Sequence, residues 1–367
     1  MDTFAFIIHP IDPKRDVSRK YPLLGKILSE RQIDFFSTFF PPVYISEIEG
    51  IVSAATGKEI KGWFVACPLT PRRMLELPVS QVYRKIIQTG RLAERLGAKI
   101  LGLGAFTSVI GDAGITIARA LEIPVTTGDA YTVAIAVQAT VKAAEIMDLP
   151  LSDVTVAVVG ATGAIGRVCA YLLAPQAGRL LLIARNPERL EALAAQLRPL
   201  SHGEIVWSTD LSDLRQAAVI LTVTSAVHSI IEPQHLLPGS VVCDVARPRD
   251  VSAMVAANRD DILVIDGGMV DVPGAVNFHF DFGFPPGKAY ACMAETMALA
   301  LEGRFEDYTL GKEISLERVQ EITQIAEKHG FRLSGFRAFE KNVTEEHIET
   351  VKRKAQWRRA TARHLSI

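Results

Sequence analysis

VTVAVVGATGAIG, residues 154–166, decides the fold of this chain. Its apolar first half predicts a fully buried parallel strand, and helical periodicity begins directly after the glycines. Gly160 permits a tight turn after the strand, Gly163 lets backbone N–H groups approach an anion, and Gly166 lets the helix pack close to the sheet. This order of strand, loop and helix predicts a Rossmann-type dinucleotide site, and a purely structural turn is the plainer alternative.

The next strand indicates which dinucleotide binds. It ends in LLLIARNPERL (180–190), where Arg185 and Asn186 stand in place of the acidic residue that holds the ribose of NAD. Arginine suits a 2′-phosphate, and GxxGxxG spacing is typical of NADP-using enzymes, so NADP(H) is expected unless Arg185 is only a solvated surface residue. The predicted cofactor contacts are Gly160, Thr162, Gly163, Ala164, Ile165, Arg185 and Asn186, with Thr224, Ser225 and Gly267 added from topology alone.

Strand and helix patterns alternate on both sides of this loop. The sequence therefore predicts an α/β protein: an N-terminal α/β domain, a Rossmann-type domain with a doubly wound parallel sheet, and C-terminal helices. A hairpin is expected over residues 45–66, and one helix over 12–30. The expected parts are a substrate domain (1–128), a linking helix (129–150), the NADP-binding domain (151–286), helices returning to the N-terminal domain (287–336) and a basic helical tail (337–367).

The composition is that of an ordinary globular chain, with 49% hydrophobic and 22% charged residues. A net charge of −1 argues neither for nor against a polyanionic partner, and no nucleic acid partner is expected. The four cysteines show no CxxC spacing, so neither a metal site nor a disulfide framework is expected, and a reduced, cytoplasmic setting is favoured. No apolar run is long enough to predict a membrane helix.

One cysteine is a candidate nucleophile. Cys292 lies in KAYACMAE (288–295), in the first turn of a helix expected to begin near Ala289. A helix N-terminus lowers a thiol pKa, and Lys288 would add to that effect, so the thiolate could attack a thioester. The alternative is a small buried hydrophobe, which is also the expectation for Cys67, Cys169 and Cys243. Lone histidines such as His9 are read as structural rather than catalytic.

These motifs, taken together and in order, resemble the cyanobacterial long-chain acyl-(acyl-carrier-protein) reductases. That family implies two-domain enzymes that use NADPH to reduce fatty acyl thioesters to aldehydes through a cysteine acyl-enzyme. Its cysteine maps to Cys292, and Gly104-Ala105-Phe106-Thr107-Ser108 maps to the active-site cleft, where Thr107 and Ser108 are candidate oxyanion donors. The similar stretches are RDVSRKY (15–21), SAATGKEIKGWFVAC (53–67), LGAFTSVI (103–110), TTGDAYTVAIAVQA (126–139), VTVAVVGATGAIGRVC (154–169), LIARNPERLEAL (182–193), ACMAETMALALEGRF (291–305) and GKEISLERVQEITQIAEKHGF (311–331).

The chain departs from that family in two places. Residues 270–288 are shorter and different, which bears on the acyl pocket, and the tail beyond about Arg337 is extra. The tail's basic helix, which includes Lys354, Arg359 and Arg363, would suit an acidic acyl carrier protein or a membrane surface, unless it is simply solvated.

The sequence therefore predicts NADPH-dependent reduction of an acyl-carrier or acyl-CoA thioester to a fatty aldehyde, with acyl chain length and oligomeric state left open. Two rival functions remain. One is a shikimate- or quinate-type NADP-dependent alcohol dehydrogenase, and the other is a non-catalytic NADP-binding regulatory protein. A Lys/Asp pair in the N-terminal domain would mark the first rival, and the sequence does not identify one.

Overall fold

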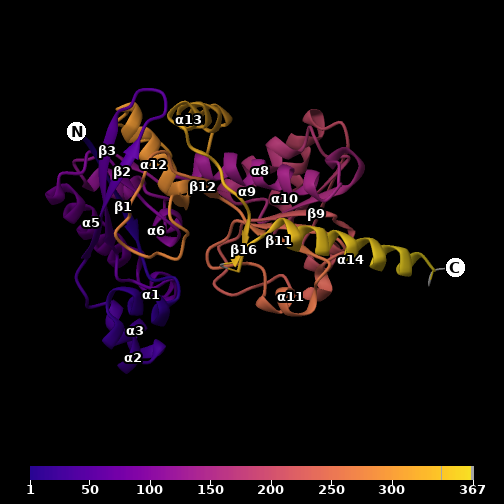
Figure 1. Ribbon diagram of the computed structural model, residues 1–367, viewed down its shortest axis with the longest axis horizontal. Helices are drawn as coiled ribbons and strands as arrows, with labels where there is room; N and C mark the ends of the chain where they lie inside the picture. Colours follow the sequence, from indigo (N-terminus) through magenta and orange to yellow (C-terminus); the bar gives the residue numbers. More distant parts are fainter. Residues whose placement is uncertain (340, 365–367) are drawn as a thin grey trace. The chain divides into compact units, whose positions relative to one another are not determined.

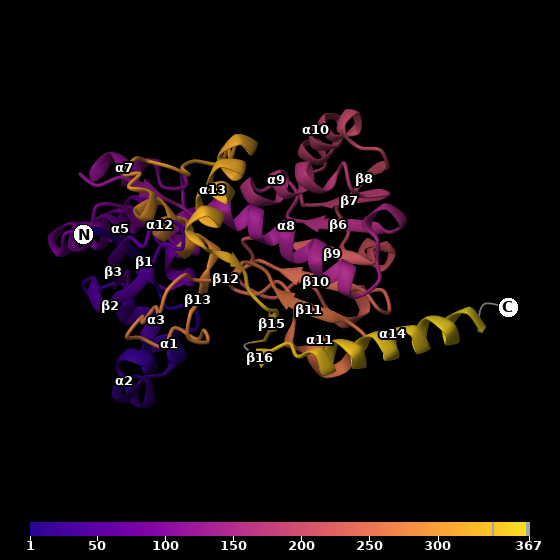
Figure 2. The same ribbon diagram turned by 45° about the horizontal axis from the view of Figure 1, so that its top comes forward.

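The computed structural model describes residues 1–339 and 341–364, with side chains of the last helix described as far as Arg358. The chain forms two compact units. Unit 1 comprises Met1–Thr132 and Val270–Arg332, and unit 2 comprises Val133–Met269 and the chain from Leu333 onward. Both units combine a β-sheet with helices, which confirms the predicted α/β class (Figures 1 and 2).

Unit 1 contains a five-stranded sheet in the order β2-β3-β1-β4-β5. β2 pairs antiparallel with β3 through the predicted hairpin, whereas the other neighbours are parallel. The core of the unit lies on this sheet, where Phe4, Phe6 and Phe64 are almost fully buried. The strands are β1 (Asp2–Ile8), β2 (Val43–Val52), β3 (Glu59–Ala66), β4 (Leu101–Gly102) and β5 (Val125–Thr126).

Two long helices pack on this sheet, α5 (Val79–Leu96) and α12 (Ala291–Glu302). α5 ends at Gly97, a left-handed C-cap with φ 91°. α12 begins after β13 (Lys288–Tyr290) and carries Cys292. The other helices of unit 1 are α1 (Pro13–Lys20), α2 (Pro22–Ile27), α3 (Glu30–Ser37), α4 (Pro71–Glu76), α6 (Phe106–Val109), α7 (Ile115–Ala120) and α13 (Leu316–His329).

The prediction of one helix over residues 12–30 was wrong. The segment breaks between α1 and α2 at Tyr21, whose φ and ψ are −129° and 77°. Pro22 explains the break, because its ring disfavours the α conformation in the preceding residue and it has no N–H to continue the ladder. α3 then begins afresh at a capping box formed by Ser29 and Gln32.

Unit 2 is built on a six-stranded sheet in the order β11-β10-β9-β6-β7-β8, with all neighbours parallel. Counted along the chain, this is the doubly wound order of dinucleotide-binding domains. The sequence reading missed one edge strand, β8, which exposes Trp207. The strands are β6 (Thr155–Val159), β7 (Arg179–Ile183), β8 (Glu204–Ser208), β9 (Val219–Thr222), β10 (Val241–Asp244) and β11 (Leu263–Asp266).

Helices α9 and α10 follow β6 and β7. The helices of unit 2 are α9 (Ala164–Leu173), α10 (Pro187–Leu197), α11 (Ala253–Asn258) and α14 (Glu345–His364), with short 3-10 turns over 151–153, 198–200, 211–216 and 233–235. α8 (Asp129–Ile146), the predicted linking helix, is divided between the units after Thr132.

The chain leaves unit 2 at Met269, earlier than the boundary expected at 286. After that point it forms β12 (Met269–Asp271), which lies between β13 and β14 (Arg332–Leu333) in a small sheet. Residues 270–286 bond into unit 1, since Glu49 and Asn277 exchange both backbone hydrogen bonds. A short hairpin of β15 (Arg337–Ala338) and β16 (Lys341–Asn342) precedes α14.

Candidate active site and nucleotide site

Cys292 is the second residue of α12, in the first turn, as the sequence predicted. The residue at the helix start, Tyr290, makes no side-chain cap, so backbone donors are left near the sulfur. Cys292 is half-buried, whereas Cys67, Cys169 and Cys243 are buried in the core as expected. All four are free thiols.

Gly128 lies directly against Cys292. A Cβ at position 128 would fall 2.4 Å from both the Cα and the Cβ of Cys292, and Gly128 has φ +77°. Only glycine combines that left-handed backbone with so close an approach. The turn between β5 and α8 therefore forms one wall of the cysteine site.

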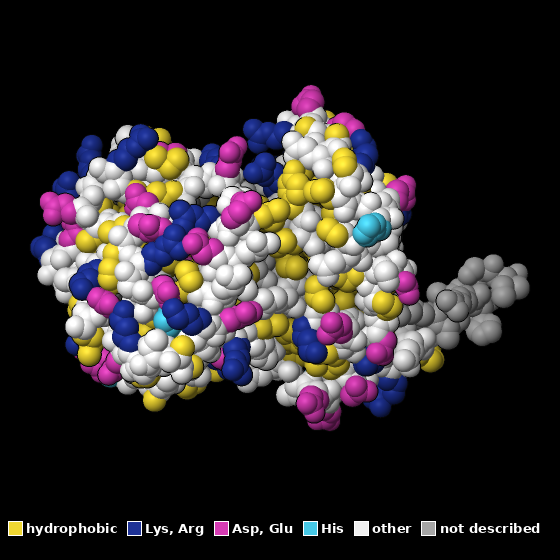
Figure 3. Space-filling model, turned by 90° about the horizontal axis from the view of Figure 1, so that it is seen from above, with side chains coloured by type: hydrophobic (Ala, Val, Ile, Leu, Met, Phe, Trp, Pro, Cys, Tyr) yellow, Lys and Arg dark blue, Asp and Glu magenta, His cyan; other side chains and the backbone are white. Residues whose placement is uncertain are grey.

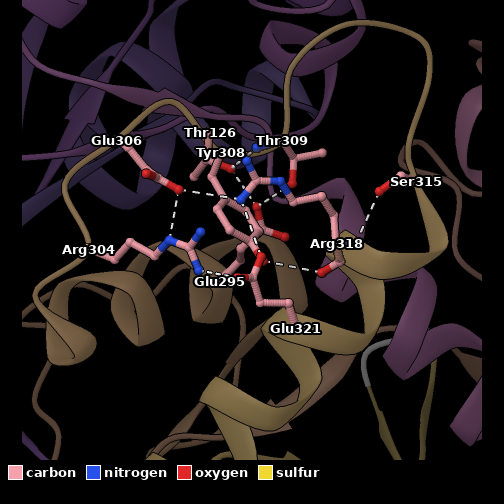
Figure 4. A network of polar contacts seen from close by, with 9 residues as sticks. All are labelled: Thr126, Glu295, Arg304, Glu306, Tyr308, Thr309, Ser315, Arg318 and Glu321. Atoms are coloured by element: carbon pink, nitrogen blue, oxygen red, sulfur yellow. Dashed lines mark hydrogen bonds and ion pairs between the residues drawn. The ribbon is translucent and has the colours of Figure 1, made fainter.

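A buried carboxyl group, Glu295, lies about one turn of helix beyond the cysteine. Its oxygens accept hydrogen bonds from the Thr309 hydroxyl at 2.8 Å and the Tyr131 backbone N–H at 2.8 Å. The Thr126 hydroxyl also donates to Glu295, so two stretches of chain, residues 126–131 and the loop at Thr309, converge there (Figure 4). Burial raises the pKa of Glu295, and these donors oppose that rise.

An outer network anchors the loop that carries Thr309 (Figure 4). The centroid of the Tyr308 ring lies 5.3 Å from the guanidinium carbon of Arg304 and 4.5 Å from that of Arg318. Its hydroxyl donates to Glu321 at 2.9 Å, and both arginines also pair with Glu321. The loop after α12 is thus tied to α13, which holds Thr309 on Glu295.

Asp129 is the second buried acid of the site, with 5% of its surface exposed. Burial raises the pKa of Asp129 to about 7, and the nearby Glu295 carboxylate raises it as well. Asp129, whose charge acts on Cys292, can therefore accept or donate a proton near neutral pH.

The prediction that the helix start lowers the pKa of Cys292 was wrong. Burial raises the pKa of this thiol to about 12, and the Asp129 charge is the second cause. Desolvation and a neighbouring anion both disfavour the thiolate and outweigh the helix N-terminus. Lys288 does not offset them, because its ammonium pairs with Asp271 at 2.5 Å.

The loop over residues 104–108 is held mainly by its own hydrogen bonds. Ala105 has the unusual φ of +48°, and the next N–H, of Phe106, donates to His9 Nε2 at 3.1 Å. Thr107 donates its hydroxyl to Gly104 O at 2.8 Å, and Ser108 donates to Ala105 O at 2.7 Å. Because both hydroxyl protons are engaged, an oxyanion role for these two residues remains a prediction that requires the turn to rearrange.

His9 has a structural place in the same loop. Burial lowers the pKa of His9 to about 4, so its imidazole is neutral at physiological pH and accepts the Phe106 N–H. A neutral, buried imidazole in this position orients the loop and does not supply a proton.

In unit 2 the three loop glycines have the backbone geometry that the sequence predicted. Gly160 has φ +82°, and a Cβ there would lie 2.4 Å from Val223 O on the neighbouring strand end. A Cβ on Gly166 would lie 2.3 Å from Gly160 O, so this glycine allows the close packing of helix and strand. A Cβ on Gly163 would meet only Gly160 O, at 3.2 Å, which leaves the approach to the helix start open.

The surroundings of this loop fit a dinucleotide phosphate. Gly163 is the N-cap of α9 and makes no side-chain cap, so the first-turn N–H groups of Ala164 and Ile165 point to an anion site. Arg185 is exposed at the end of β7, and no ion pair engages it within the described residues. Asn186 instead has a local task, because its side chain caps α10 by accepting from the Arg189 N–H at 2.7 Å.

The sequence reading missed a polar cluster at the carboxyl edge of the same sheet. Asp250 accepts from the Thr222 hydroxyl at 2.6 Å and from the Thr224 hydroxyl and N–H at 2.5 and 3.0 Å. Asp244 accepts from the Val251 N–H at 3.0 Å, and burial raises its pKa to about 7. The signal was DVARPRD (244–250), with one acid at the end of a buried strand and a second six residues later.

The other predicted cofactor contacts have mixed surroundings. Thr224 is fixed by Asp250, and Ser225 is exposed beside it. Gly267 has a packing reason for being glycine, since a Cβ would lie 2.6 Å from Val245 Cγ2 and 2.9 Å from Cys243 Sγ. Contact between Gly267 and the nicotinamide ring remains a prediction.

Three basic side chains of α14 are already paired within unit 2. Lys352 binds Asp148 at 2.9 Å, and Lys354 binds Asp260 at 2.5 Å. Arg358 reaches Asp260 and the fully buried Asp261, both at 2.8 Å. These pairs hold the helix on its own unit, while the predicted contributions of the Arg359 and Arg363 side chains lie outside the described residues.

The described part of the protein also has features that bear on metal binding, membrane crossing and surface charge. Among residues 1–339 and 341–364, no three His, Cys, Asp or Glu side chains are grouped as metal ligands. In the same part of the chain, none of the helices has both the length and the apolarity needed to cross a bilayer. The face shown in Figure 3 intersperses basic and acidic side chains.

A family match and several similar proteins were found by comparison with known proteins. Residues 142–266, within unit 2, match the family described as shikimate / quinate 5-dehydrogenase. The solved L-tryptophan dehydrogenase of Nostoc punctiforme is 15% identical, with a TM-score of 0.41 over 97% of this chain and 88% of that chain. Sheet order, glycine loop and the family match define an NAD(P)-dependent oxidoreductase.

Two curated relatives cover most of the chain. Aminotransferase PigE of a Serratia species is 32% identical over 82% of this chain, which spans only 36% of that protein's length. The long-chain acyl-[acyl-carrier-protein] reductase of Synechococcus elongatus is 30% identical over 90% of this chain and 98% of its own length. The chain belongs to the family of this reductase.

Proposed function

We propose that the protein reduces a fatty acyl thioester, carried by an acyl carrier protein or coenzyme A, to a fatty aldehyde with NADPH. The observation that carries the proposal is the half-buried Cys292 at the start of α12, packed against Gly128, in a chain whose family includes an acyl-carrier-protein reductase. The three other cysteines are buried in the core and offer no comparable nucleophile.

The first half of the reaction uses only residues of unit 1. Cys292 Sγ forms a bond to the thioester carbonyl carbon, and the bond from that carbon to the carrier sulfur breaks. The thiol proton passes to the Asp129 carboxylate and from there to the departing carrier thiolate. The products are a free carrier thiol and an acyl group on Cys292.

Asp129 suits this task because the cysteine is not ionised beforehand. Burial raises the pKa of Cys292 to about 12, so the proton must leave as the sulfur attacks. The pKa of Asp129, about 7, lets that carboxyl group accept and release a proton at neutral pH. Glu295 is held in its own position by three donors, and its charge contributes to the raised pKa of Asp129.

Unit 2 supplies the cofactor site. The N–H groups of Ala164 and Ile165 would bind the pyrophosphate, and the exposed Arg185 guanidinium would bind the 2′-phosphate. NADPH, when bound, supplies the hydride that releases the acyl group from Cys292 as an aldehyde. The Asp250–Thr224 contact keeps the adjacent strand end rigid.

Intact-protein mass spectrometry tests the proposal. The protein incubated with a long-chain acyl-CoA and no NADPH should gain one acyl mass, located on Cys292 by peptide mapping. The Cys292→Ala variant should gain none and should lose aldehyde formation by at least about a thousandfold. Cys67→Ala, at a buried cysteine of the same unit, is the matched control and should keep both the adduct and the activity.

The rivals give different results in the same experiment. A shikimate-type dehydrogenase would form no adduct and would oxidise a cyclic hydroxy acid equally well with Cys292→Ala. A regulatory protein would bind NADPH and form neither adduct nor product. Absence of the adduct while NADPH binding is intact rules out the acyl-enzyme.

A further inference from the structure

Large apolar side chains crowd one surface of unit 1, on helices α2 and α3. Ile27 and Leu23 of α2 are 76% and 71% exposed, and Phe39, just after α3, is 69% exposed. The patch, called here the aromatic patch, consists of Leu23, Ile27, Phe35, Phe36, Phe39 and Phe40. Isolated exposed apolar residues are ordinary, but six within eighteen positions mark a surface that meets something apolar.

Three aromatic rings of the patch contact each other. The Phe35 ring lies 5.4 Å from that of Phe36 and 5.5 Å from that of Phe39. α1, α2 and α3 lie together at the lower end of unit 1 in both ribbon views (Figures 1 and 2). The exposed apolar side chains of the patch are therefore carried by neighbouring helices and the turn after them.

Positive charge borders the aromatic patch. A hollow of about 320 Å³ beside Phe35 is lined by Arg31, Arg72 and Arg73, with Asp34 as its only acid. Arg72 and Arg73 also bind Glu76, at 2.7 and 3.0 Å. Arg31 has no ion pair within the described residues, and positions 13–37 hold six Lys or Arg against three Asp or Glu.

This combination fits a lipid surface better than a protein partner. The phenylalanines stand on an outward surface, and the hollow at its border is lined mainly by arginines rather than by apolar side chains. A deformable bilayer accepts such side chains without a complementary shape, while guanidinium groups bind the headgroup phosphates. A second copy of the chain would bring like charges together at the rim.

We propose that the aromatic patch is a peripheral anchor on anionic membranes. Phe35, Phe36, Phe39 and Ile27 enter the boundary between headgroups and acyl chains, and Arg31, Arg72 and Arg73 bind phosphate at its edge. The anchor is independent of the proposed reaction, since all its residues lie outside the contacts made around Cys292. It would place the protein where acyl chains and aldehydes partition.

Co-sedimentation of the full chain with vesicles tests the anchor. Binding should be stronger to phosphatidylcholine vesicles that contain phosphatidylglycerol than to phosphatidylcholine alone. Ile27→Ser with Phe39→Ser should weaken binding at least about tenfold, because each side chain loses its apolar burial. Leu200→Ser with Met254→Ser, which changes two exposed apolar residues of unit 2, is the matched control and should change nothing.

A charge variant separates the two parts of the anchor. Arg31→Glu should remove the preference for phosphatidylglycerol while leaving weak binding to phosphatidylcholine. Equal vesicle binding by the wild type and the Ile27/Phe39 variant overturns the proposal. So does a dimer in sedimentation velocity that the same variant dissociates, or a loss of acyl carrier binding with vesicle binding unchanged. Aldehyde formation from a soluble acyl-CoA should persist in both variants, which separates this test from that of the reaction.

Discussion

The nucleotide loop and the cysteine site are built in opposite ways. The loop is one continuous stretch, in which β6, Gly160, Gly163 and α9 follow directly along the chain. The cysteine site joins the segment around Gly128 to Glu295 and Thr309, which lie more than 160 positions further along the chain. One site is made by local backbone geometry, and the other exists only when unit 1 is fully packed.

The electrostatics of the two sites differ as well. At the loop, uncapped N–H groups and the exposed Arg185 offer fixed positive charge to a solvated anion. Around Cys292, burial holds two carboxyl groups and a thiol toward their neutral forms. A site of the first kind can bind as soon as its helix forms, whereas the second must move protons during its reaction.

The largest expected effect comes from exchanging glycine for alanine in each site. Gly128→Ala should destabilise unit 1 by about 2–5 kcal/mol, because φ is +77° and the new Cβ meets Cys292. Gly163→Ala should change stability by less than about 1 kcal/mol, since its Cβ meets only one oxygen at 3.2 Å, yet weaken NADPH binding about tenfold or more. Denaturant unfolding and NADPH fluorescence titration measure the two effects.

If Gly128→Ala and Gly163→Ala lowered the unfolding free energy equally, the contrast between the two sites would fail. The nucleotide loop would then depend on close packing as much as the cysteine site does. Gly57→Ala is the control for positive φ alone. Gly57 has φ +68°, and a Cβ there would have no atom within 4 Å. The fall in unfolding free energy caused by Gly57→Ala therefore measures backbone strain without a steric clash.

A pH experiment probes the buried acids. Because the pKa of Asp129 is about 7 when folded and near 3.8 when unfolded, the native state holds a proton that the unfolded state has released in this interval. The contribution of Asp129 to the free energy of unfolding is therefore complete below about pH 4 and is lost as the pH rises to about 7. Asp129→Asn should gain stability relative to the wild type across that window, measured by denaturant midpoints at several pH values.

The test depends on the difference in unfolding free energy between the wild type and Asp129→Asn at each pH, not on how steeply either protein's stability changes with pH. Asp244 of unit 2 also has a pKa raised to about 7 and gives the same pH dependence in both. Parallel curves for wild type and Asp129→Asn would show that Asp129 is solvated and ionised like an ordinary surface acid.

The same contrast explains what the sequence could predict. The loop geometry, the parallel sheet and the position of Cys292 at a helix start follow from residues within about one turn or strand of each other. The pKa of Cys292 could not be predicted, because it depends on Asp129 and on burial by segments more than 150 positions away. Thr107 and Ser108 were chosen for their hydroxyls, and only the folded turn shows where those protons go.

The missed features are also non-local. The structural role of Asp250 depends on hydrogen bonds from Thr222 and Thr224, which lie at the end of another strand. The break at Pro22 was local and could have been predicted, since a proline within a helical pattern ends or interrupts it. The sequence thus predicted best those features in which a single continuous stretch of chain forms both the local structure and the binding site.

A smaller effect is expected at the predicted 2′-phosphate contact. Arg185→Ala should raise the Kd for NADPH by about 10- to 100-fold and leave that for NADH unchanged, because only NADPH carries the phosphate. Isothermal titration with both cofactors measures this. Arg198→Ala, which removes an arginine already paired with Glu191 at 2.8 Å, is the control and should alter neither Kd. A matching loss for NADH would place Arg185 outside the phosphate site.

The smallest effect is expected on α14, where Lys352, Lys354 and Arg358 are already paired with acids of unit 2. Lys354→Ala removes a surface pair with Asp260 and should lower the free energy of unfolding by less than about 1 kcal/mol. If this helix docked an acidic carrier, the same change would raise the KM for an acyl carrier thioester but not for acyl-CoA. The pairing with Asp260 argues against that result, so both KM values should stay the same. Arg353→Ala is the sharper comparison, because Arg353 is exposed and has no ion pair among the described residues. Suppose that Arg353→Ala raises the KM for the acyl carrier thioester but not for acyl-CoA, and that Lys354→Ala raises neither. The carrier would then dock on basic side chains of α14 that are not paired with acids of unit 2.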